Sequence, residues 1–203
     1  MPAKYVPLAT DEIYHVFNRG VDKRVIYNDN KDYIRFYESL YYFNCVEPTT
    51  NLGFAKIQNY KSVQKLVAIE AYCLLPNHFH LLVKQKVDGG ISEFIRRITS
   101  GYASYYNLKH KRNGALFQGK FKRVHIQSNE QYNYLLAYVN ENHVVHKLPN
   151  PTEVFQTSGM AYTEGLKSKV LNEVSGQYNQ KEGRAVARDI YKKRQKLKYL
   201  LDE

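Results

Sequence analysis

The stretch VAIEAYCLLPNHFHLLVKQ, residues 67–85, decides the fold of this chain. Two runs of strand-forming residues flank Pro76-Asn77, and a turn-forming pair in that position predicts a β-hairpin or a bulged connection. Because side chains alternate between the two faces of a strand, Phe79 is expected to face the core while His78 and His80 share the opposite face. The stretch therefore predicts an antiparallel strand pair that presents two imidazoles on one surface.

Outward from this hairpin, strand-like and helical patterns alternate along the chain. In order, the sequence predicts a strand at 13–18, a helix from Asp29, an irregular insertion at 44–63, the hairpin, a helix over 91–105, an extended run at 115–127 and a helix from Ser128. Ser128 and Gln131 fit a capping box, which marks a helix N-terminus. This order favours an α+β fold in which helices pack on an antiparallel sheet.

The length of 203 residues suits one domain, or one domain with an appendage. Residues 1–149 are expected to form the compact domain, and residues 150–203 a C-terminal tail with a basic helix from about Lys181 to Leu201. The chain has no apolar run near the roughly 20 residues that a membrane span requires, its first residues lack the apolar core of a secretion signal, and its two cysteines cannot form a disulfide framework. We therefore expect a cytoplasmic protein that contacts no membrane.

The net charge indicates a polyanionic partner, most often nucleic acid. Lys and Arg total 30 and Asp and Glu total 19, which gives a formal charge of +11. Residues 96–123 carry eight of the cations and no acid, with aromatic residues between them, a pattern that suits single-stranded nucleic acid better than a solvated helix face of mixed charge. The candidate phosphate-binding residues are Arg96, Arg97, Lys109, Lys111, Arg112, Lys120, Lys122 and Arg123, together with Arg19 in the turn after the first strand.

Two histidines alone make an incomplete metal site, because a metal catalyst needs a third ligand and open positions. The helix from Ser128 could supply that ligand, since Asn142 follows Tyr138 by four residues and both side chains share one helix face. The amide of Asn142 could offer a neutral oxygen to a hard ion. Tyr138 would lie beside the ion, where a cation lowers the pKa of a phenol and favours its attack as a nucleophile.

Each of these residues also has an ordinary structural interpretation. An isolated His-x-His is more often a half-exposed pair on a strand than a metal site. Tyr138 could be an aromatic residue at the edge of an apolar stripe, and Tyr134 is a rival nucleophile one turn earlier. Taken residue by residue, these alternatives stay open.

Four segments, taken together and in order, resemble a known family. They are Y-H-V-F-N-R-G (Tyr14–Gly20), Y-C-L-L-P-N-H-F-H-L-L-V (Tyr72–Val83), G-A-L-F-Q-G-K-F-K (Gly114–Lys122) and A-Y-V-N-E-N-H-V (Ala137–Val144). The chain resembles the single-tyrosine HUH transposases of small insertion sequences, and among them the REP-associated tyrosine transposases. The resemblance covers about residues 13–148 and does not include the tail.

This resemblance implies a ferredoxin-like fold, with helices packed on one face of the sheet, and a Mg²⁺- or Mn²⁺-dependent enzyme. The enzyme would nick and rejoin single-stranded or hairpin DNA through a 5′-phosphotyrosine intermediate, and would be nucleoid-associated when bound to DNA. By position, His78 and His80 match the metal pair, Tyr138 the nucleophile and Asn142 the third ligand. Many relatives continue with Asn-Pro, whereas His143 follows here, and its role is not assigned.

Two other functions remain under consideration beside the transposase. The first is a protein of the same fold that only binds DNA or RNA hairpins and needs none of the four site residues. The second is a metal-dependent hydrolase in which water is the nucleophile and Glu70, His125 or His143 is the general base. The resemblance also leaves open whether the protein acts as a monomer or a homodimer.

Overall fold

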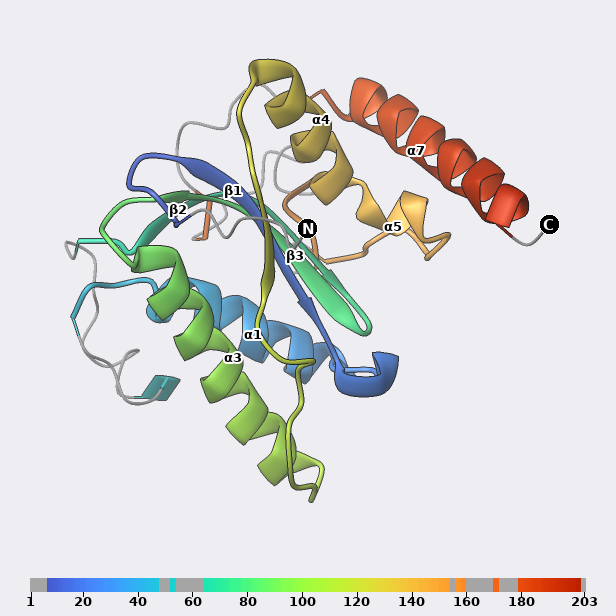
Figure 1. The fold of residues 1–203 in the computed structure, drawn as a ribbon. Coiled ribbons are helices and arrows are strands. Elements are labelled where there is room, and N and C mark those ends of the chain that lie inside the picture. The colour runs from blue at the N-terminus through green and yellow to red at the C-terminus, as the bar shows by residue number, and fades with distance from the viewer. Residues whose placement is uncertain are drawn as a thin grey trace.

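A four-stranded antiparallel sheet forms the centre of the molecule (Figure 1). The computed structural model describes residues 7–47, 52–53, 64–153, 156–159, 170–171 and 179–201. The strands are β1 (Ile13–Arg19), β2 (Val67–Leu75), β3 (His78–Gln85) and β4 (Lys122–His125), and their order in the sheet is β2-β3-β1-β4. With α1 (Asn30–Tyr42) between β1 and β2 and α3 (Gly90–Lys109) between β3 and β4, this is the split β-α-β topology of a ferredoxin-like fold.

The hairpin predicted at residues 67–85 is confirmed. β2 and β3 pair antiparallel, and Leu75 lies opposite His78 across the two-residue turn Pro76-Asn77. A register shift between Ile69 and Ala71 adds a bulge in the middle of β2. The expected elements at 13–18, from Asp29, over 91–105 and from Ser128 are present as β1, α1, α3 and α4 (Asn129–Asn140), whereas most of the insertion at 44–63 lies outside the described residues.

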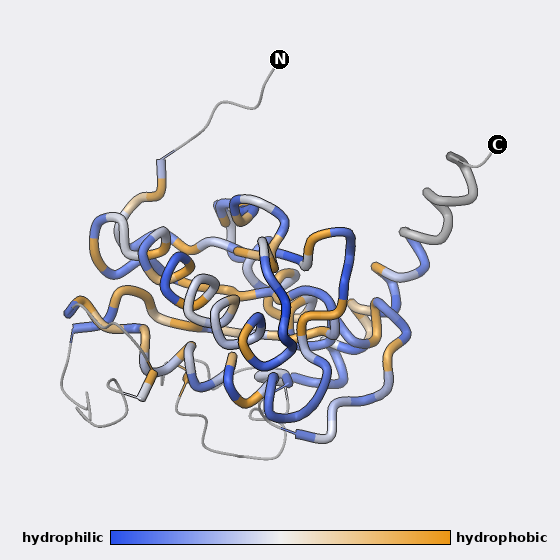
Figure 2. Tube along the Cα trace, turned by 90° about the horizontal axis from the view of Figure 1, so that it is seen from below, coloured by the Kyte–Doolittle hydropathy of each residue, from blue (hydrophilic) through white to orange (hydrophobic). Residues whose placement is uncertain are grey.

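The two faces of the sheet are each covered by helices (Figure 1). On the first face, Phe79 of β3 packs on Phe36 of α1 with 5.1 Å between ring centroids, and Tyr102 of α3 completes this cluster. On the second face, Leu82 of β3 belongs to a cluster with Val139 of α4. Every residue of β2 is buried, which requires cover on both faces. A second helical layer therefore joins the expected one, and hydrophobic segments run through the middle of the molecule (Figure 2).

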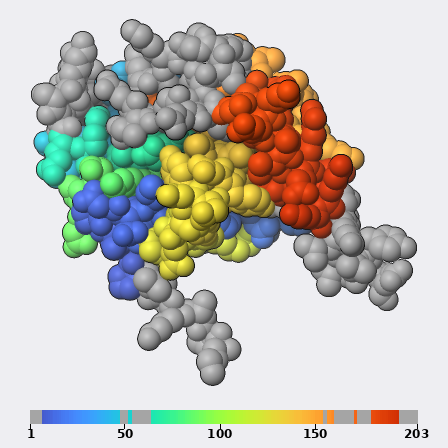
Figure 3. Space-filling model, turned by 90° about the horizontal axis from the view of Figure 1, so that it is seen from above, coloured from blue at the N-terminus to red at the C-terminus, as the bar shows by residue number. Residues whose placement is uncertain are grey.

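The C-terminal region is part of the second helical layer. It includes α5 (Asn142–Val145) and α7 (Gln180–Leu201), and Ala187 and Ile190 of α7 are buried in the same cluster as Val139 of α4. Thr157 forms an isolated bridge with Cys73 of β2. Figure 3 shows α7 lying against the segment that includes α4. Apolar side chains of α7 therefore pack on the preceding domain, and the boundary expected at residue 149 stays a prediction. Within the described part of the chain, no helix has the length and apolar character needed to cross a membrane.

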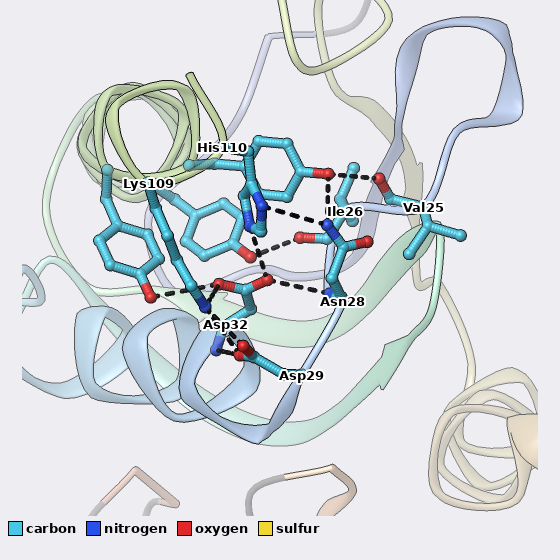
Figure 4. A network of polar contacts seen from close by, with 10 residues as sticks. Val25, Ile26, Asn28, Asp29, Asp32, Lys109 and His110 are labelled. Atoms are coloured by element: carbon cyan, nitrogen blue, oxygen red, sulfur yellow. Dashed lines mark hydrogen bonds and ion pairs between the residues drawn. The ribbon is translucent and has the colours of Figure 1, made fainter. Parts of the chain in front are cut away.

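A buried carboxylate connects the start of α1 to the end of α3 (Figure 4). Asp29 caps α1 by accepting a hydrogen bond from the backbone N–H of Asp32 at 3.0 Å. The side chain of Asp32 is fully buried and accepts from Lys109 Nζ at 2.7 Å and from the hydroxyl of Tyr105 at 3.1 Å, with His110 Nε2 at 3.2 Å. The ammonium of Lys109, expected from the sequence to contact phosphate, is thus engaged in an ion pair inside the fold.

We expect Lys109→Met to lower the free energy of unfolding by roughly 3 kcal/mol, because it leaves the buried carboxylate of Asp32 without its ammonium partner. Chemical denaturation measures this change. Lys111→Met is the matched control, since Lys111 is exposed and its loss is expected to cost less than about 0.5 kcal/mol. Weaker DNA binding by Lys109→Met with unchanged stability would contradict this assignment.

Candidate active site

A cavity of about 500 Å³ opens beside the turn between β2 and β3. Its wall combines side chains from β1, β3, α4, the loop before β4 and the segment after α5. The side chains with candidate chemistry are His78, His80, Lys120, Lys122, Tyr138 and His146. The fold therefore brings the predicted histidine pair and the predicted tyrosine to one cavity, although they lie far apart in the sequence.

The two predicted metal-binding histidines share the second face of the sheet. Their ring centroids are 5.0 Å apart and their planes are nearly perpendicular. His78 Nδ1 lies 2.6 Å from Oδ1 of Asn77, and His80 Nδ1 lies 2.8 Å from Nε2 of His15 on β1. Because a neighbour engages each Nδ1, this pair would coordinate an ion through its Nε2 atoms.

The tautomer of His78 follows from the orientation of the Asn77 amide. Asn77 Nδ2 donates to the carbonyl of Lys23 at 3.1 Å, which assigns the other amide atom, Oδ1, to the side of His78. An amide oxygen only accepts hydrogen bonds, so Nδ1 of His78 carries the proton and Nε2 carries a lone pair. This is the tautomer that a metal ligand requires when it binds through Nε2.

His15 gives His80 a comparable partner. It is buried and stacks on Phe17, with centroids 5.1 Å apart, and it meets the edge of Tyr138 at 5.8 Å. Burial lowers the pKa of His15 to about 4, so its imidazole is neutral at pH 7. When Nε2 of His15 accepts the proton on Nδ1 of His80, Nε2 of His80 keeps its lone pair. The sequence alone does not predict His15 or Asn77 as a partner of these histidines, because each contact depends on strand register or turn geometry.

The register of α4 places Tyr138 against the histidine pair. The helix begins after Ser128, whose side chain accepts from the backbone N–H of Gln131 at 3.2 Å, as half of the predicted capping box. Ten residues later the ring of Tyr138 is buried and meets the ring of His80 at 5.4 Å with an angle of 84°. Tyr134, the rival nucleophile, is 45% exposed and does not line the cavity.

Asn142, the predicted third ligand, begins α5 and is fully buried. Its Nδ2 donates to the carbonyl of Tyr138 at 3.2 Å, and its Oδ1 has no hydrogen-bond partner among the described residues. A buried amide oxygen without a donor fits a ligand for a hard cation, although Asn142 is not among the residues that line the cavity. His146, one turn later, does line it and packs on His78 with centroids 4.9 Å apart.

Histidine, cysteine and carboxylate side chains do not complete a metal site by themselves. Among the described residues, no three of them are grouped so that they could hold an ion. A third donor would therefore have to be of another type, such as the Oδ1 atom of Asn142, the phenol of Tyr138 or an oxygen of a bound phosphate. This donor set of two imidazoles with neutral or phosphate oxygens suits Mg²⁺ or Mn²⁺.

The candidate phosphate-binding residues fall into three groups. Arg19, Lys120 and Lys122 line the cavity with Tyr138, and Lys23 joins them from outside the predicted set. Arg96, Arg123 and again Lys120 line a second cavity. The remaining four residues line neither cavity. Arg97 donates to Glu93 and to the carbonyl of Cys45, and Arg112 donates to Asn107 and to the carbonyl of Ala115. Lys109 pairs with Asp32, and Lys111 is exposed after the end of α3.

None of the three general bases considered for a hydrolase lines the cavity. Glu70 is buried in β2 beside the hydroxyl of Tyr132, and His125 Nε2 lies 2.7 Å from a carboxylate oxygen of Glu12. His143 is buried on the other side of α5, where its Nε2 lies 3.6 Å from the carboxylate of Glu141. The arrangement favours a side-chain nucleophile over a water activated by one of these residues.

Burial of His15 and His143 is expected to make the metal-free protein less stable in acid. Burial lowers the pKa of each imidazole to about 4, whereas the unfolded chain takes up these protons near pH 6.5. The unfolded state therefore binds more protons as the pH falls from about 6.5 to 4, and stability declines across that interval by on the order of 1–2 kcal/mol for each histidine at pH 5. Urea unfolding in EDTA at pH 7 and pH 5 measures the loss, and His143→Gln should show a smaller one. A pH-independent midpoint would contradict the assignment.

This chain resembles known proteins both in sequence and in fold. The sequence model of the family described as "Transposase IS200 like" matches residues 41–142, a range that contains both histidines, Tyr138 and Asn142. No curated protein matches the chain. A solved structure described as "Structure of the REP associates tyrosine transposase bound to a REP hairpin" is 15% identical, with a TM-score of 0.58, and the match covers 88% of this chain and 99% of that one. This likeness shows that the two proteins share a fold.

Proposed function

Because the chain belongs to the family of IS200-like transposases, we propose that it cuts and rejoins single-stranded or hairpin DNA through a covalent tyrosine intermediate. The observation that carries this proposal is the convergence of Tyr138, His78 and His80 on one cavity with a basic wall. The structural neighbour, which is described as bound to a REP hairpin, supports a hairpin as the DNA partner.

In the proposed reaction, the phenolic oxygen of Tyr138 attacks the scissile phosphorus and loses its proton. The bond from phosphorus to the 3′ oxygen breaks, the 3′ oxygen takes up a proton, and the 5′ phosphate stays on the tyrosine. Attack by a 3′ hydroxyl reverses these steps and rejoins a strand without ATP, because the aryl phosphate ester retains the energy of the broken bond. Lys120 and Lys122 neutralise the phosphates that flank the cut.

We assign the metal site to His78, His80 and Asn142, with Mg²⁺ or Mn²⁺ as the ion. When bound there, the ion would polarise the scissile phosphate as a Lewis acid. Asn77 and His15 are positioning residues: they hold a proton on Nδ1 of each imidazole, so that Nε2 carries the lone pair with which each imidazole would coordinate. The ring of His146 packs on the ring of His78 and adds a third imidazole to the lining of the cavity.

The nucleophile and the histidine pair meet within one chain. The ring centroids of Tyr138 and His80 of the same chain are 5.4 Å apart. We therefore propose that the tyrosine acts at the metal site of its own chain and that a monomer is sufficient for cleavage.

Analysis of the cut ends tests the proposed function. The protein is incubated with Mn²⁺ and single-stranded or hairpin oligonucleotides that carry a fluorophore at either end, and the products are separated under denaturing conditions. The proposal predicts a free 3′ hydroxyl on one fragment and a protein-blocked 5′ end on the other, with no cleavage in EDTA. Free 5′ phosphates would establish a hydrolase, and binding without cleavage would establish a hairpin-binding protein.

The two positioning residues give a prediction that does not depend on catalysis. Asn77→Ala and His15→Phe each remove the partner of one Nδ1 atom, so each is expected to weaken Mn²⁺ binding by about 10- to 100-fold. Isothermal titration measures the affinity, and nitrogen NMR of the imidazoles reports the shift in tautomer. His125→Gln is the matched control, because His125 pairs with Glu12 outside the cavity. Wild-type metal affinity in both variants would overturn the positioning role.

A further inference from the structure

A second cavity adjoins the catalytic one. It has a volume of about 560 Å³, and Asn18 and Lys120 line both cavities. The strand β4 separates them, because its successive side chains point to opposite faces of the sheet: Lys122 lines the catalytic cavity and Arg123 the second one. A ligand that passes from one cavity to the other would therefore cross the loop at residues 118–121, just before β4.

The loop between the cavities is anchored to the end of β1. Asn18 Nδ2 donates to the carbonyl of Gly119 at 3.2 Å, and the backbone N–H of Gln118 donates to the carbonyl of Arg19 at 2.8 Å. Gly119 has a φ of +64°, a conformation that favours glycine and lets the chain turn tightly there. These contacts hold the loop at residues 118–121 in place, so both cavities are formed before a ligand binds.

The chemistry of the second cavity suits an unstacked nucleobase. Ile95, Leu116, Phe117 and Phe121 give it apolar and aromatic surface, and no carboxylate is among the described residues that line it. Lys120 and Arg123 add positive charge, whereas the guanidinium of Arg96 is paired with the carboxylate of Glu93 at 2.7 Å. Aromatic surface beside cations is the combination on which bases of a single strand stack while their phosphates stay neutralised.

We propose that the second cavity binds a base of the same DNA strand whose scissile phosphate lies in the catalytic cavity. The strand runs over the loop at residues 118–121, with Lys120 contacting the phosphate between the two sites. This inference rests on the proposed function, because that function places the scissile phosphate in the catalytic cavity. The second cavity itself is present whether or not the protein cuts DNA. A base that is paired in a duplex cannot enter, so the cavity selects single-stranded segments next to the cut.

Two variants alter the cavity in opposite ways. Ala103→Trp fills it from α3, where Ala103 is half-buried on its wall, and Phe121→Ala removes a half-buried ring. The probes are a 12-nucleotide oligo-dT and a 12-nucleotide strand of abasic sites, which keeps the phosphates and lacks the bases. We expect the wild type to bind oligo-dT about tenfold more tightly than the abasic strand, as one stacked base provides. Each variant should lose most of that preference while its affinity for the abasic strand stays within twofold.

The control separates this inference from the proposed function. His78→Ala leaves the second cavity intact and should keep the preference for oligo-dT, whatever it does to cleavage. Equal affinity of the wild type for both probes would overturn the proposal, and so would variants that fold, by circular dichroism, and keep the full preference. If Ala103→Trp fails to fold, Phe121→Ala carries the same comparison. Photocrosslinking of 5-iododeoxyuridine in the strand should label Phe117 or Phe121, and labelling confined to other residues would also contradict it.

Discussion

Replacing Tyr138 with phenylalanine is expected to abolish the covalent protein–DNA adduct. Phenylalanine keeps the ring, which packs against His80, and removes only the oxygen that attacks the phosphate. The free energy of unfolding should change by no more than about 1 kcal/mol, the contribution of one hydrogen bond. DNA affinity should also remain, because the cations that line the cavity are unchanged. Denaturing gel electrophoresis after incubation with Mn²⁺ and labelled DNA measures the adduct.

Tyr134→Phe is the control for this experiment, because it makes the same chemical change one turn earlier on α4, at a ring that is 45% exposed. It should form the adduct at the wild-type rate. Adduct formation that depends on Tyr134 and survives Tyr138→Phe would contradict the assignment of the nucleophile. Cleavage by Tyr138→Phe that leaves free 5′ ends would identify water as the nucleophile.

Replacing His78 or His80 with alanine is expected to have the next largest effect. Loss of one imidazole from the proposed metal site removes several kcal/mol of transition-state stabilisation, so cleavage should fall by about a thousandfold or more. Binding of single-stranded DNA should stay within about twofold, since the phosphate contacts belong to basic residues such as Lys120 and Lys122. Cleavage kinetics and fluorescence anisotropy measure the two quantities on the same oligonucleotide.

A control variant and a mixture of two variants test whether the loss is specific to the metal site and whether it occurs within one chain. His125→Ala removes a histidine that lies outside the cavity and should cleave normally. An equimolar mixture of Tyr138→Phe and His80→Ala should stay inactive, because the tyrosine is proposed to act at the metal site of its own chain. Recovery of cleavage in the mixture would show that the tyrosine of one chain acts at the metal site of another. Equal loss of DNA binding and cleavage in His80→Ala would make the histidine a structural residue.

Much of the sheet could be predicted from the sequence because its signals are local. The Pro76-Asn77 turn and the apolar runs around it determine the hairpin, and Asp29 and Ser128 mark the starts of α1 and α4. The packing of α7 is not a local property. Ala187 and Ile190 identify an apolar side of the helix, but the sequence does not predict that this side packs on α4. The sequence therefore predicts the tail but not where it packs.

The same distinction applies to the candidate site. The alternation of a strand puts His78 and His80 on one face. The sequence predicts Tyr138 and Asn142 on one face of a single helix, whereas α4 ends at Asn140 and Asn142 begins α5, so their proximity depends on the turn at Glu141. Contacts that depend on the pairing of distant strands were missed, as for His15, whose strand β1 pairs with β3 so that its ring reaches His80. Charge alone could not tell Lys109, which pairs with a buried carboxylate, from Lys120, which lines both cavities.

Mass spectrometry of the trapped adduct identifies the residue that attacks DNA. The wild-type protein is incubated with Mn²⁺ and single-stranded or hairpin DNA, denatured, treated with nuclease and digested with trypsin. The proposed function predicts a peptide that carries a nucleotide linked through a 5′ phosphate to the phenolic oxygen of Tyr138, and the absence of this peptide when EDTA is present. A nucleotide on Tyr134 or any other residue, or cleaved DNA without a modified peptide, would contradict it.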